Sequence, residues 1–225
     1  VACEGSMFKS KWANARTTMM AGSLGMANAE GKLSVGYGGE AGAMTPSMTE
    51  FVRRHCRQSL AICRNEPSRD VVAKLGIRST SGTDTAWTFD PAPLEAGAKV
   101  LRGLGWDGTK PVLSVCPINP FWWPVKPSIS KLIARRTLGM YREAHYKSVY
   151  FHHDSPEARR KYDTYLNGYA EAVNAFVQET GAFPVLIGME KLDRRACEHL
   201  QPRLKNPAPV LVSDQYNMYE LVSIM

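Results

Sequence analysis

One long amphipathic segment, residues 155–181, constrains the fold of this chain more than any other feature. Ser155 followed by Pro156 is a typical helix start, and Gly181 is a typical helix end. Between them, apolar side chains recur every three or four residues, which is the period of a helix with one buried face. The short apolar run 183–188 follows at once and predicts a strand, so this region has the helix-to-strand connection of a parallel sheet.

The same alternation of strand and helix patterns extends along the whole chain. Short apolar runs, each flanked by glycine, proline or polar residues, alternate with segments of helical periodicity. This alternation is typical of an α/β fold with parallel sheets. We expect strands near residues 33–37, 60–63, 85–89, 111–116, 183–188 and 209–212.

Asp90–Pro93 interrupts this alternation and predicts a boundary between two domains. We expect residues 1–92 to be the C-terminal part of a first domain, 93–109 a linker region, and 110–225 the N-terminal part of a second domain. The chain opens without an initiator Met and stops inside an apolar, helix-like phrase. We therefore expect an internal piece of a longer protein, with both domains incomplete. Expressed alone, such a piece should aggregate or unfold easily, because a parallel sheet needs both faces covered.

Composition narrows the class of protein. With 44% hydrophobic and 22% charged residues, the chain is typical of a globular protein and not of a fibrous or disordered one. No apolar run approaches the roughly 18 residues of a membrane-spanning helix. The five cysteines are scattered and form no CxxC pair, which favours a reducing, cytoplasmic compartment.

Positive charge is concentrated in one segment, residues 126–161. Nine basic residues stand there against three acidic ones, which accounts for six of the seven net positive charges. Such a segment can attract phosphates, acidic polymers or anionic lipid, so peripheral membrane contact is one expectation. A solvated helical face is the alternative, and no nucleic-acid partner is expected.

In parallel α/β sheets, ligands bind beyond the carboxyl ends of the strands, so residues just after each expected strand are candidates. Gly38 and Gly39 could let the backbone approach a phosphate or sugar, although a tight turn explains them equally well. Arg64 could bind a carboxylate or phosphate, and a structural salt bridge is the alternative. Trp122 could stack on a sugar or simply pack in its loop. Ser68 and Asn119 are further candidates by position.

No metal site is expected. His152 and His153 are adjacent, and neighbouring residues of a strand point to opposite faces, so the pair cannot easily share one ion.

Several short phrases together resemble the polysaccharide pyruvyl transferase family. They are Glu4-Gly5-Ser6, the glycine-ended strand 31–39, Arg64-Asn65-Glu66-Pro67-Ser68 continued to Leu75-Gly76-Ile77, and segments 84–91, 110–117 and 165–200. Asn65 departs from the pattern, because an acidic residue is usual there. Residues 121–150 look like an insertion.

The resemblance implies two Rossmann-like parallel-sheet domains of the glycosyltransferase B type. It implies transfer of a pyruvyl group from phosphoenolpyruvate to a saccharide as a ketal, without cofactor or metal. A lipid could carry that saccharide. The implied substrate-binding residues are Gly5, Ser6, Gly38, Gly39, Arg64, Ser68, Asn119 and Trp122.

The catalytic base is not assigned, and Glu4, Glu40 and Glu190 are candidates by position. The family's Arg/His segment is expected beyond residue 225, so the chain alone should be inactive. The same residues are compatible with two other functions. One is a nucleotide-sugar glycosyltransferase or sugar epimerase of the same fold, and the other is a glycan-binding module without catalysis.

Overall fold

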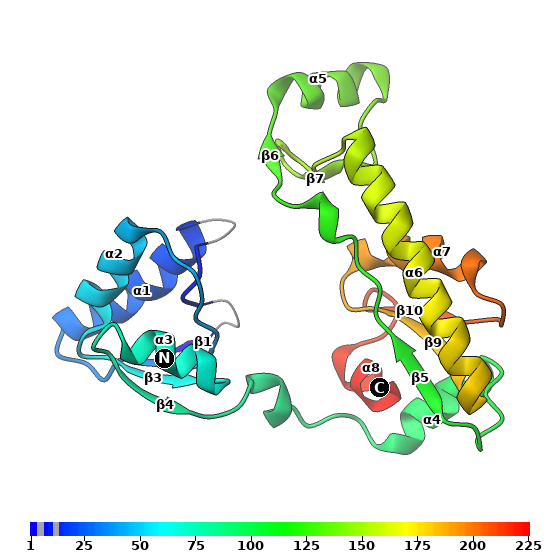
Figure 1. Ribbon diagram of the computed structural model, residues 1–225, viewed down its shortest axis with the longest axis horizontal. Helices are drawn as coiled ribbons and strands as arrows, with labels where there is room; N and C mark the ends of the chain where they lie inside the picture. The colour runs from blue at the N-terminus through cyan, green and yellow to red at the C-terminus, as the bar shows by residue number, and fades with distance from the viewer. Residues whose placement is uncertain (4–6, 11–13) are drawn as a thin grey trace. The chain divides into compact units, whose positions relative to one another are not determined.

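A computed structural model describes residues 1–3, 7–10 and 14–225 of the chain (Figure 1). The described residues form two compact units, Val1–Phe89 and Asp90–Met225. Each unit is built on a parallel β-sheet, so the chain is an α/β protein, as the strand–helix alternation predicts.

The sheet of the first unit has four parallel strands in the order β1-β2-β3-β4. Because neighbours in the sheet are also neighbours in sequence, right-handed crossovers place all the connecting helices on one face. The strands are β1 (Ala2–Cys3), β2 (Val35–Gly39), β3 (Leu60–Cys63) and β4 (Arg78–Ser81), and the helices are α1 (Asn14–Ala29), α2 (Pro46–Cys56) and α3 (Glu66–Ala73).

Side chains of β3 show how the two faces of this sheet differ. Ala61 and Cys63 are buried in one apolar cluster with residues of α1, α2 and α3. Leu60 and Ile62 alternate with them, point to the opposite face and are only partly buried. The core of the first unit therefore lies on the helical side of its sheet.

The expected strand at 85–89 is wrong. Thr85–Thr88 is a 3₁₀ turn, η1, and the side chain of Asp84 caps it by accepting a hydrogen bond from the Ala86 N–H at 3.0 Å. The strand at this edge is β4, whose sequence Arg-Ser-Thr-Ser has no apolar period to reveal it. An edge strand can form through backbone hydrogen bonds without apolar side chains. The polar run 78–81 therefore forms the edge strand that was expected at residues 85–89.

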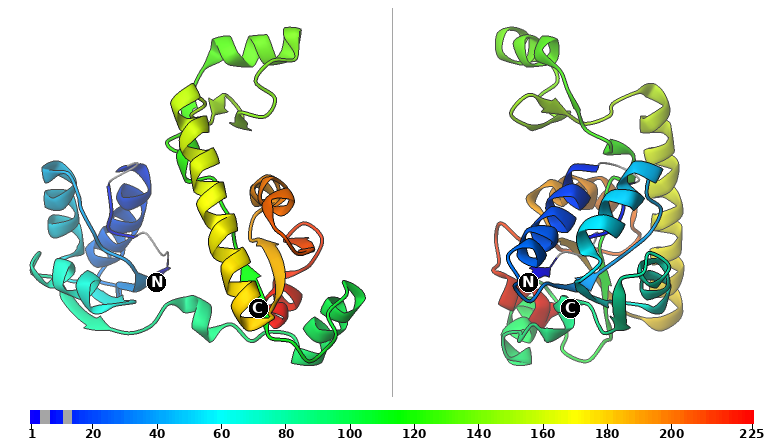
Figure 2. Two further views of the ribbon diagram at one scale, coloured as in Figure 1. Left: turned by 45° about the vertical axis from the view of Figure 1, so that its right-hand side comes forward. Right: turned by 90° about the vertical axis from the view of Figure 1, so that its left-hand side faces the viewer.

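The sheet of the second unit has three parallel strands in the order β10-β9-β5. They are β5 (Val112–Val115), β9 (Phe183–Gly188) and β10 (Val210–Val212), all close to their expected positions. Helix α6 (Pro156–Thr180) leads into β9, and α7 (Arg194–Leu200) lies between β9 and β10. Figure 2 shows α6 running along the sheet.

The central strand β9 is covered on both faces. Leu186 packs in a cluster with residues of α6 and α7. Val185 and Ile187 point the other way, into a cluster with residues of α4 (Leu94–Gly103) and α8 (Met218–Ile224). This two-sided burial explains why β9 reads as a continuous apolar run.

Helix α4 belongs to the second unit, although it lies in the segment 93–109 that was expected to be a linker region. It packs so closely on α8 that a Cβ added at Gly97 would lie 2.2 Å from the Ser223 carbonyl oxygen. Glycine at this position is what allows the two helices to touch. Helix α4 therefore packs as part of the second unit.

The caps predicted for α6 are confirmed. The Ser155 hydroxyl accepts a hydrogen bond from the Ala158 N–H at 3.1 Å, and Gly181 ends the helix with a φ of +68°, in the left-handed region.

Residues 126–151 form a separate substructure between β5 and α6, which we call the arm. It consists of β6 (Lys126–Pro127), α5 (Ile129–Leu138), β7 (His145–Lys147) and β8 (Tyr150–Phe151). Its three short strands form an antiparallel sheet in the order β6-β8-β7. Both figures show α5 beyond the N-terminal end of α6, away from the parallel sheet of this unit (Figures 1 and 2).

Within the described part of the chain, no helix combines the length and the apolar character needed to cross a bilayer.

Candidate functional site

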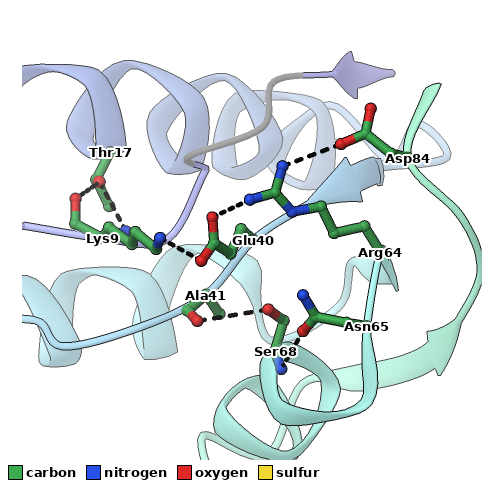
Figure 3. A network of polar contacts seen from close by, with 8 residues as sticks. All are labelled: Lys9, Thr17, Glu40, Ala41, Arg64, Asn65, Ser68 and Asp84. Atoms are coloured by element: carbon green, nitrogen blue, oxygen red, sulfur yellow. Dashed lines mark hydrogen bonds and ion pairs between the residues drawn. The ribbon is translucent and has the colours of Figure 1, made fainter. Parts of the chain in front are cut away.

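A polar cluster lies beyond the carboxyl ends of the strands in the first unit. Glu40 follows β2, Arg64 follows β3 and Asp84 comes shortly after β4. The Arg64 guanidinium donates from Nη1 to Asp84 Oδ2 at 3.0 Å and from Nη2 to Glu40 (Figure 3). Lys9 forms an ion pair with the same Glu40 carboxylate. Two cations and two carboxylates thus balance one another at this edge of the sheet.

The cluster holds both of its carboxylates in the ionised state. The hydrogen bond from Lys9, supported by Arg64, lowers the pKa of Glu40. The backbone N–H of Ala86 and then Arg64 lower the pKa of Asp84. A carboxylate with a lowered pKa is a weak proton acceptor, so this environment suits Glu40 to positioning Arg64 better than to acting as a general base.

The salt bridge left open as one role for Arg64 is present. Its side chain remains 31% exposed while Asp84 and Glu40 fix its position. A guanidinium has five N–H donors in one plane, so these two contacts do not use its full donor capacity. The geometry therefore accommodates both a structural role and the binding of an anion.

Asn65 and Ser68 begin helix α3. The Asn65 side chain accepts a hydrogen bond from the Ser68 N–H at 3.0 Å. Asn and Asp serve equally well as N-caps, which explains why Asn can stand where the resemblance expects an acidic residue. Ser68 is buried, and its hydroxyl donates to the Ala41 carbonyl at 3.5 Å, so it joins α3 to the loop after β2.

The two glycines after β2 are explained by packing within the chain. Gly38 has a φ of +68°, and an added Cβ would lie 3.0 Å from Thr85 Cγ2. A Cβ on Gly39 would lie 3.1 Å from Met7 Cβ. The chain's own side chains occupy the space beside both glycines, which favours the tight-turn interpretation. Glu4, Gly5 and Ser6 lie outside the described residues.

A cavity of about 330 Å³ lies in the second unit, beside the segments that follow β5 and β9. It contains Asn119 and Trp122, two of the residues expected to bind substrate. Its lining consists of Asn119, Trp122, Glu143, Ala144, His152, Asp154, Arg159, Tyr162, Arg195 and His199. Glu190 lies elsewhere: it is exposed after β9, where its N–H donates to the Asp193 side chain at 2.9 Å.

Two side chains in this cavity have buried polar atoms without partners. His152 is 2% exposed, and neither ring nitrogen makes a hydrogen bond of normal geometry with the described residues. The hydroxyl of Tyr162 is likewise unpaired among the described residues. Leaving such a group unsatisfied costs about 1–3 kcal/mol, so these atoms are expected to meet a ligand or ordered water.

Burial also determines the protonation state of these two groups. It lowers the pKa of His152, so the imidazole is neutral at pH 7, with one nitrogen donating and the other accepting. Burial raises the pKa of Tyr162 to about 12, so its hydroxyl keeps its proton. The unpaired donors and acceptors beside the cavity therefore belong to uncharged groups.

The charged groups of the cavity are already paired. Arg159 forms a bidentate contact with Asp154 at 2.6 and 2.7 Å, and Arg195 pairs with Glu143. These two arginines and two carboxylates leave the lining without net charge.

Trp122 lines the cavity and also packs against two neighbouring side chains. The His152 ring stacks on it at 4.6 Å between centroids, and the Arg195 guanidinium lies 5.7 Å from its centroid. These contacts use part of the ring surface that a sugar would need. They favour loop packing over sugar stacking as the role of Trp122.

The sequence predicts only Asn119 and Trp122 of the ten residues that line the cavity, and His152, Tyr162 and Arg195 are among the eight that it does not predict. His152 enters the sequence analysis only as a possible metal ligand, and Tyr162 stands at a position that the helical period of residues 155–181 assigns to the buried face. Their proximity depends on the segment between the arm and α6, α6 itself and α7 meeting in space, which no local pattern signals. Among the described residues, no group of three or more His, Cys, Asp or Glu side chains is arranged to hold a metal ion.

A scan against protein-family models finds no match, and searches of curated proteins and of solved structures find none. The fold and these two polar clusters define an α/β protein with candidate ligand sites near the carboxyl ends of its parallel strands.

Proposed function

We propose that the protein transfers a pyruvyl group from phosphoenolpyruvate to a saccharide, as a polysaccharide pyruvyl transferase. The type of reaction is inferred from the resemblance of the sequence to that family. The proposed donor site is at Arg64, which follows the end of β3, where an anion would bind in such a sheet. The observation that carries the saccharide side is the cavity with its unpaired His152 and Tyr162.

The polar atoms of the cavity fit a hydroxylated, uncharged ligand. Sugar hydroxyls both donate and accept hydrogen bonds, so different hydroxyls of one sugar suit the accepting and the donating nitrogen of neutral His152 and the Tyr162 hydroxyl. The dianion of a phosphate monoester only accepts, and it would leave the accepting nitrogen of His152 unpaired. The volume of about 330 Å³ lies within the usual range for small-molecule sites, roughly 300–1,000 Å³.

Phosphoenolpyruvate carries a carboxylate and a phosphate, and a fixed guanidinium binds either group in a planar, bidentate manner. In the proposed reaction, one sugar hydroxyl adds to C2 of the donor while C3 takes up a proton. A second hydroxyl of the same sugar then displaces phosphate. The products are the pyruvate ketal and inorganic phosphate, and the two hydroxyl protons end on the new methyl group and on phosphate.

The proposal includes the glycosyltransferase B architecture, whose components are two Rossmann-like parallel-sheet units in one chain. It also includes a reducing, cytoplasmic setting, because all five cysteines are free. A glycan-binding module without catalysis is a second candidate, since the cavity alone is sufficient for it.

Titration of the intact protein with two donors tests the proposal against a nucleotide-sugar glycosyltransferase of the same fold. We expect phosphoenolpyruvate to bind saturably and to raise the melting temperature, whereas a uridine diphosphate sugar has no effect. Saturable binding of the nucleotide sugar without binding of phosphoenolpyruvate would contradict the proposal.

A further inference from the structure

The arm, residues 126–151, exposes apolar side chains that its own sheet does not cover. Helix α5 has no buried residue. One side of it faces the arm's interior, where Lys131 Nζ lies 5.3 Å from the centre of the Tyr141 ring and 5.9 Å from that of Phe151. Ile129 and Ile133 are 70% and 56% exposed.

The exposed isoleucines share their helix face with a cation. Ile129, Ile133 and Arg136 stand at positions i, i+4 and i+7 of α5, so they lie on one face. Leu138 and Met140 continue the exposed apolar surface at the end of the helix. The arm therefore presents a mixed apolar and basic surface.

The charge of the arm is strongly one-sided. Its only acidic residue is Glu143, which is paired with Arg195 outside the arm. Among the described residues, no ion pair joins the arm's cations to a carboxylate. These cations are Lys126, Lys131, Arg135, Arg136, Arg142 and Lys147.

We propose that the arm docks onto a membrane surface that contains anionic lipid. Exposed aliphatic side chains beside cations are typical of helices that lie at the boundary between headgroups and acyl chains. Charge complementarity selects this occupant. A second copy would bring two strongly basic surfaces together, and a nucleic acid would use the cations but leave Ile129 and Ile133 in water. This inference goes beyond the proposed function and does not depend on it.

Vesicle co-sedimentation tests the docking surface with the protein as it is. We expect the protein to bind vesicles of phosphatidylcholine mixed with phosphatidylserine, to bind pure phosphatidylcholine vesicles far more weakly, and to lose affinity as salt is added. Removing one cation with R136Q or R142Q should weaken binding about five-fold. This corresponds to about 1 kcal/mol for each Lys or Arg near an anionic surface.

A second variant tests how much the exposed isoleucines of α5 contribute to membrane binding. The double substitution Ile129→Ser and Ile133→Ser should weaken binding about ten-fold or more, because it removes the aliphatic groups that enter the lipid. The matched control is Leu94→Ser, which removes an 80% exposed apolar side chain from α4, outside the arm. It should leave binding unchanged.

Three results would overturn the proposal: no sedimentation with the anionic vesicles, equal binding to both kinds of vesicle, or equal loss of binding in the control and the arm variants. Binding of a homopolymeric RNA in place of the anionic vesicles would assign the cations to a different partner. All of the substituted side chains except Arg142 lie on exposed helix surface, and circular dichroism of each variant checks that the fold is kept.

Discussion

Arg64 and Asp84 join the ends of two neighbouring strands through a hydrogen bond of 3.0 Å between Nη1 and Oδ2. Both side chains remain about one-third exposed, so the contact holds Arg64 in place without removing it from solvent. Pairs of this kind contribute only about 0–1 kcal/mol to stability, and the position of the guanidinium is therefore of more consequence than the energy of the pair.

Arg64→Lys should weaken phosphoenolpyruvate binding by roughly 1.5–3 kcal/mol, the range for a hydrogen bond to a charged group. Lysine keeps the charge but cannot form the planar fork. Stability should change little. A donor titration and a thermal melt of the same variant measure both effects.

The control for Arg64 is R53K, in the exposed pair of Arg53 with Glu50. It should change neither donor affinity nor stability. Normal donor affinity in R64K would remove Arg64 from the site, and a large fall in melting temperature would leave it with the structural role alone.

Tyr162→Phe separates the binding role of the cavity from its structural role. The hydroxyl is buried without a partner among the described residues, so its removal should leave stability unchanged or slightly higher. Binding of methyl glycosides should fall about three- to ten-fold, as for one lost hydrogen bond. Titration by nuclear magnetic resonance, with Tyr165→Phe as control, measures the change. Tyr165 lies on the same helix outside the cavity lining, and equal losses in both variants would contradict the assignment.

Glu40 should make the first unit sensitive to acid. Its pKa is lowered in the folded state by Lys9 and Arg64, so its contribution to stability is present above the ordinary Glu pKa of about 4.3 and is lost as the pH falls through its lowered folded value. E40Q should therefore lose stability at pH 7 and show a weaker decline below about pH 4 than the unchanged protein.

Urea unfolding across this pH range measures the acid sensitivity, with E50Q as the matched substitution in an exposed pair. If both variants follow the same pH curve as the unchanged protein, the cluster has no role in acid stability.

Gly97→Ala tests the packing of α4 on α8. The new methyl group would meet the Ser223 carbonyl oxygen at 2.2 Å, so the second unit should lose about 1–3 kcal/mol of stability. Gly103, in the same helix, has nothing within 4 Å of an added Cβ, and Gly103→Ala should be neutral or stabilising by about 0.4–1 kcal/mol. Equal unfolding free energies for the two variants would mean that α4 does not pack as described.

The sequence was sufficient to predict elements with strong local signals. Helix α6 has its cap residue, its period and its terminal glycine, and β9 is an apolar run buried on both faces. β4 was missed because it is a polar edge strand, and Asp84 turns the expected strand after it into a capped 3₁₀ turn. In this segment the sequence pattern favours residues 85–89 as the strand, but residues 78–81 are the ones that pair with β3.

Some residues of the candidate sites could likewise be predicted from local sequence, and others could not. Arg64 and Glu40 could be found because each directly follows a strand of a parallel sheet. His152 lies just after the arm, Tyr162 in α6 and Arg195 in α7, and they meet only after the chain has folded. Trp122 was found by its residue type, but its partners His152 and Arg195 give it a packing role.

Product analysis tests pyruvyl transfer most directly. The intact protein is incubated with phosphoenolpyruvate and a saccharide acceptor, and the products are measured by phosphate release, mass spectrometry and proton magnetic resonance. We predict one inorganic phosphate for each sugar that gains a pyruvate with loss of water, together with the methyl signal of a ketal. Saccharide binding without any pyruvylated product, or transfer of a sugar from a nucleotide donor, would contradict the account.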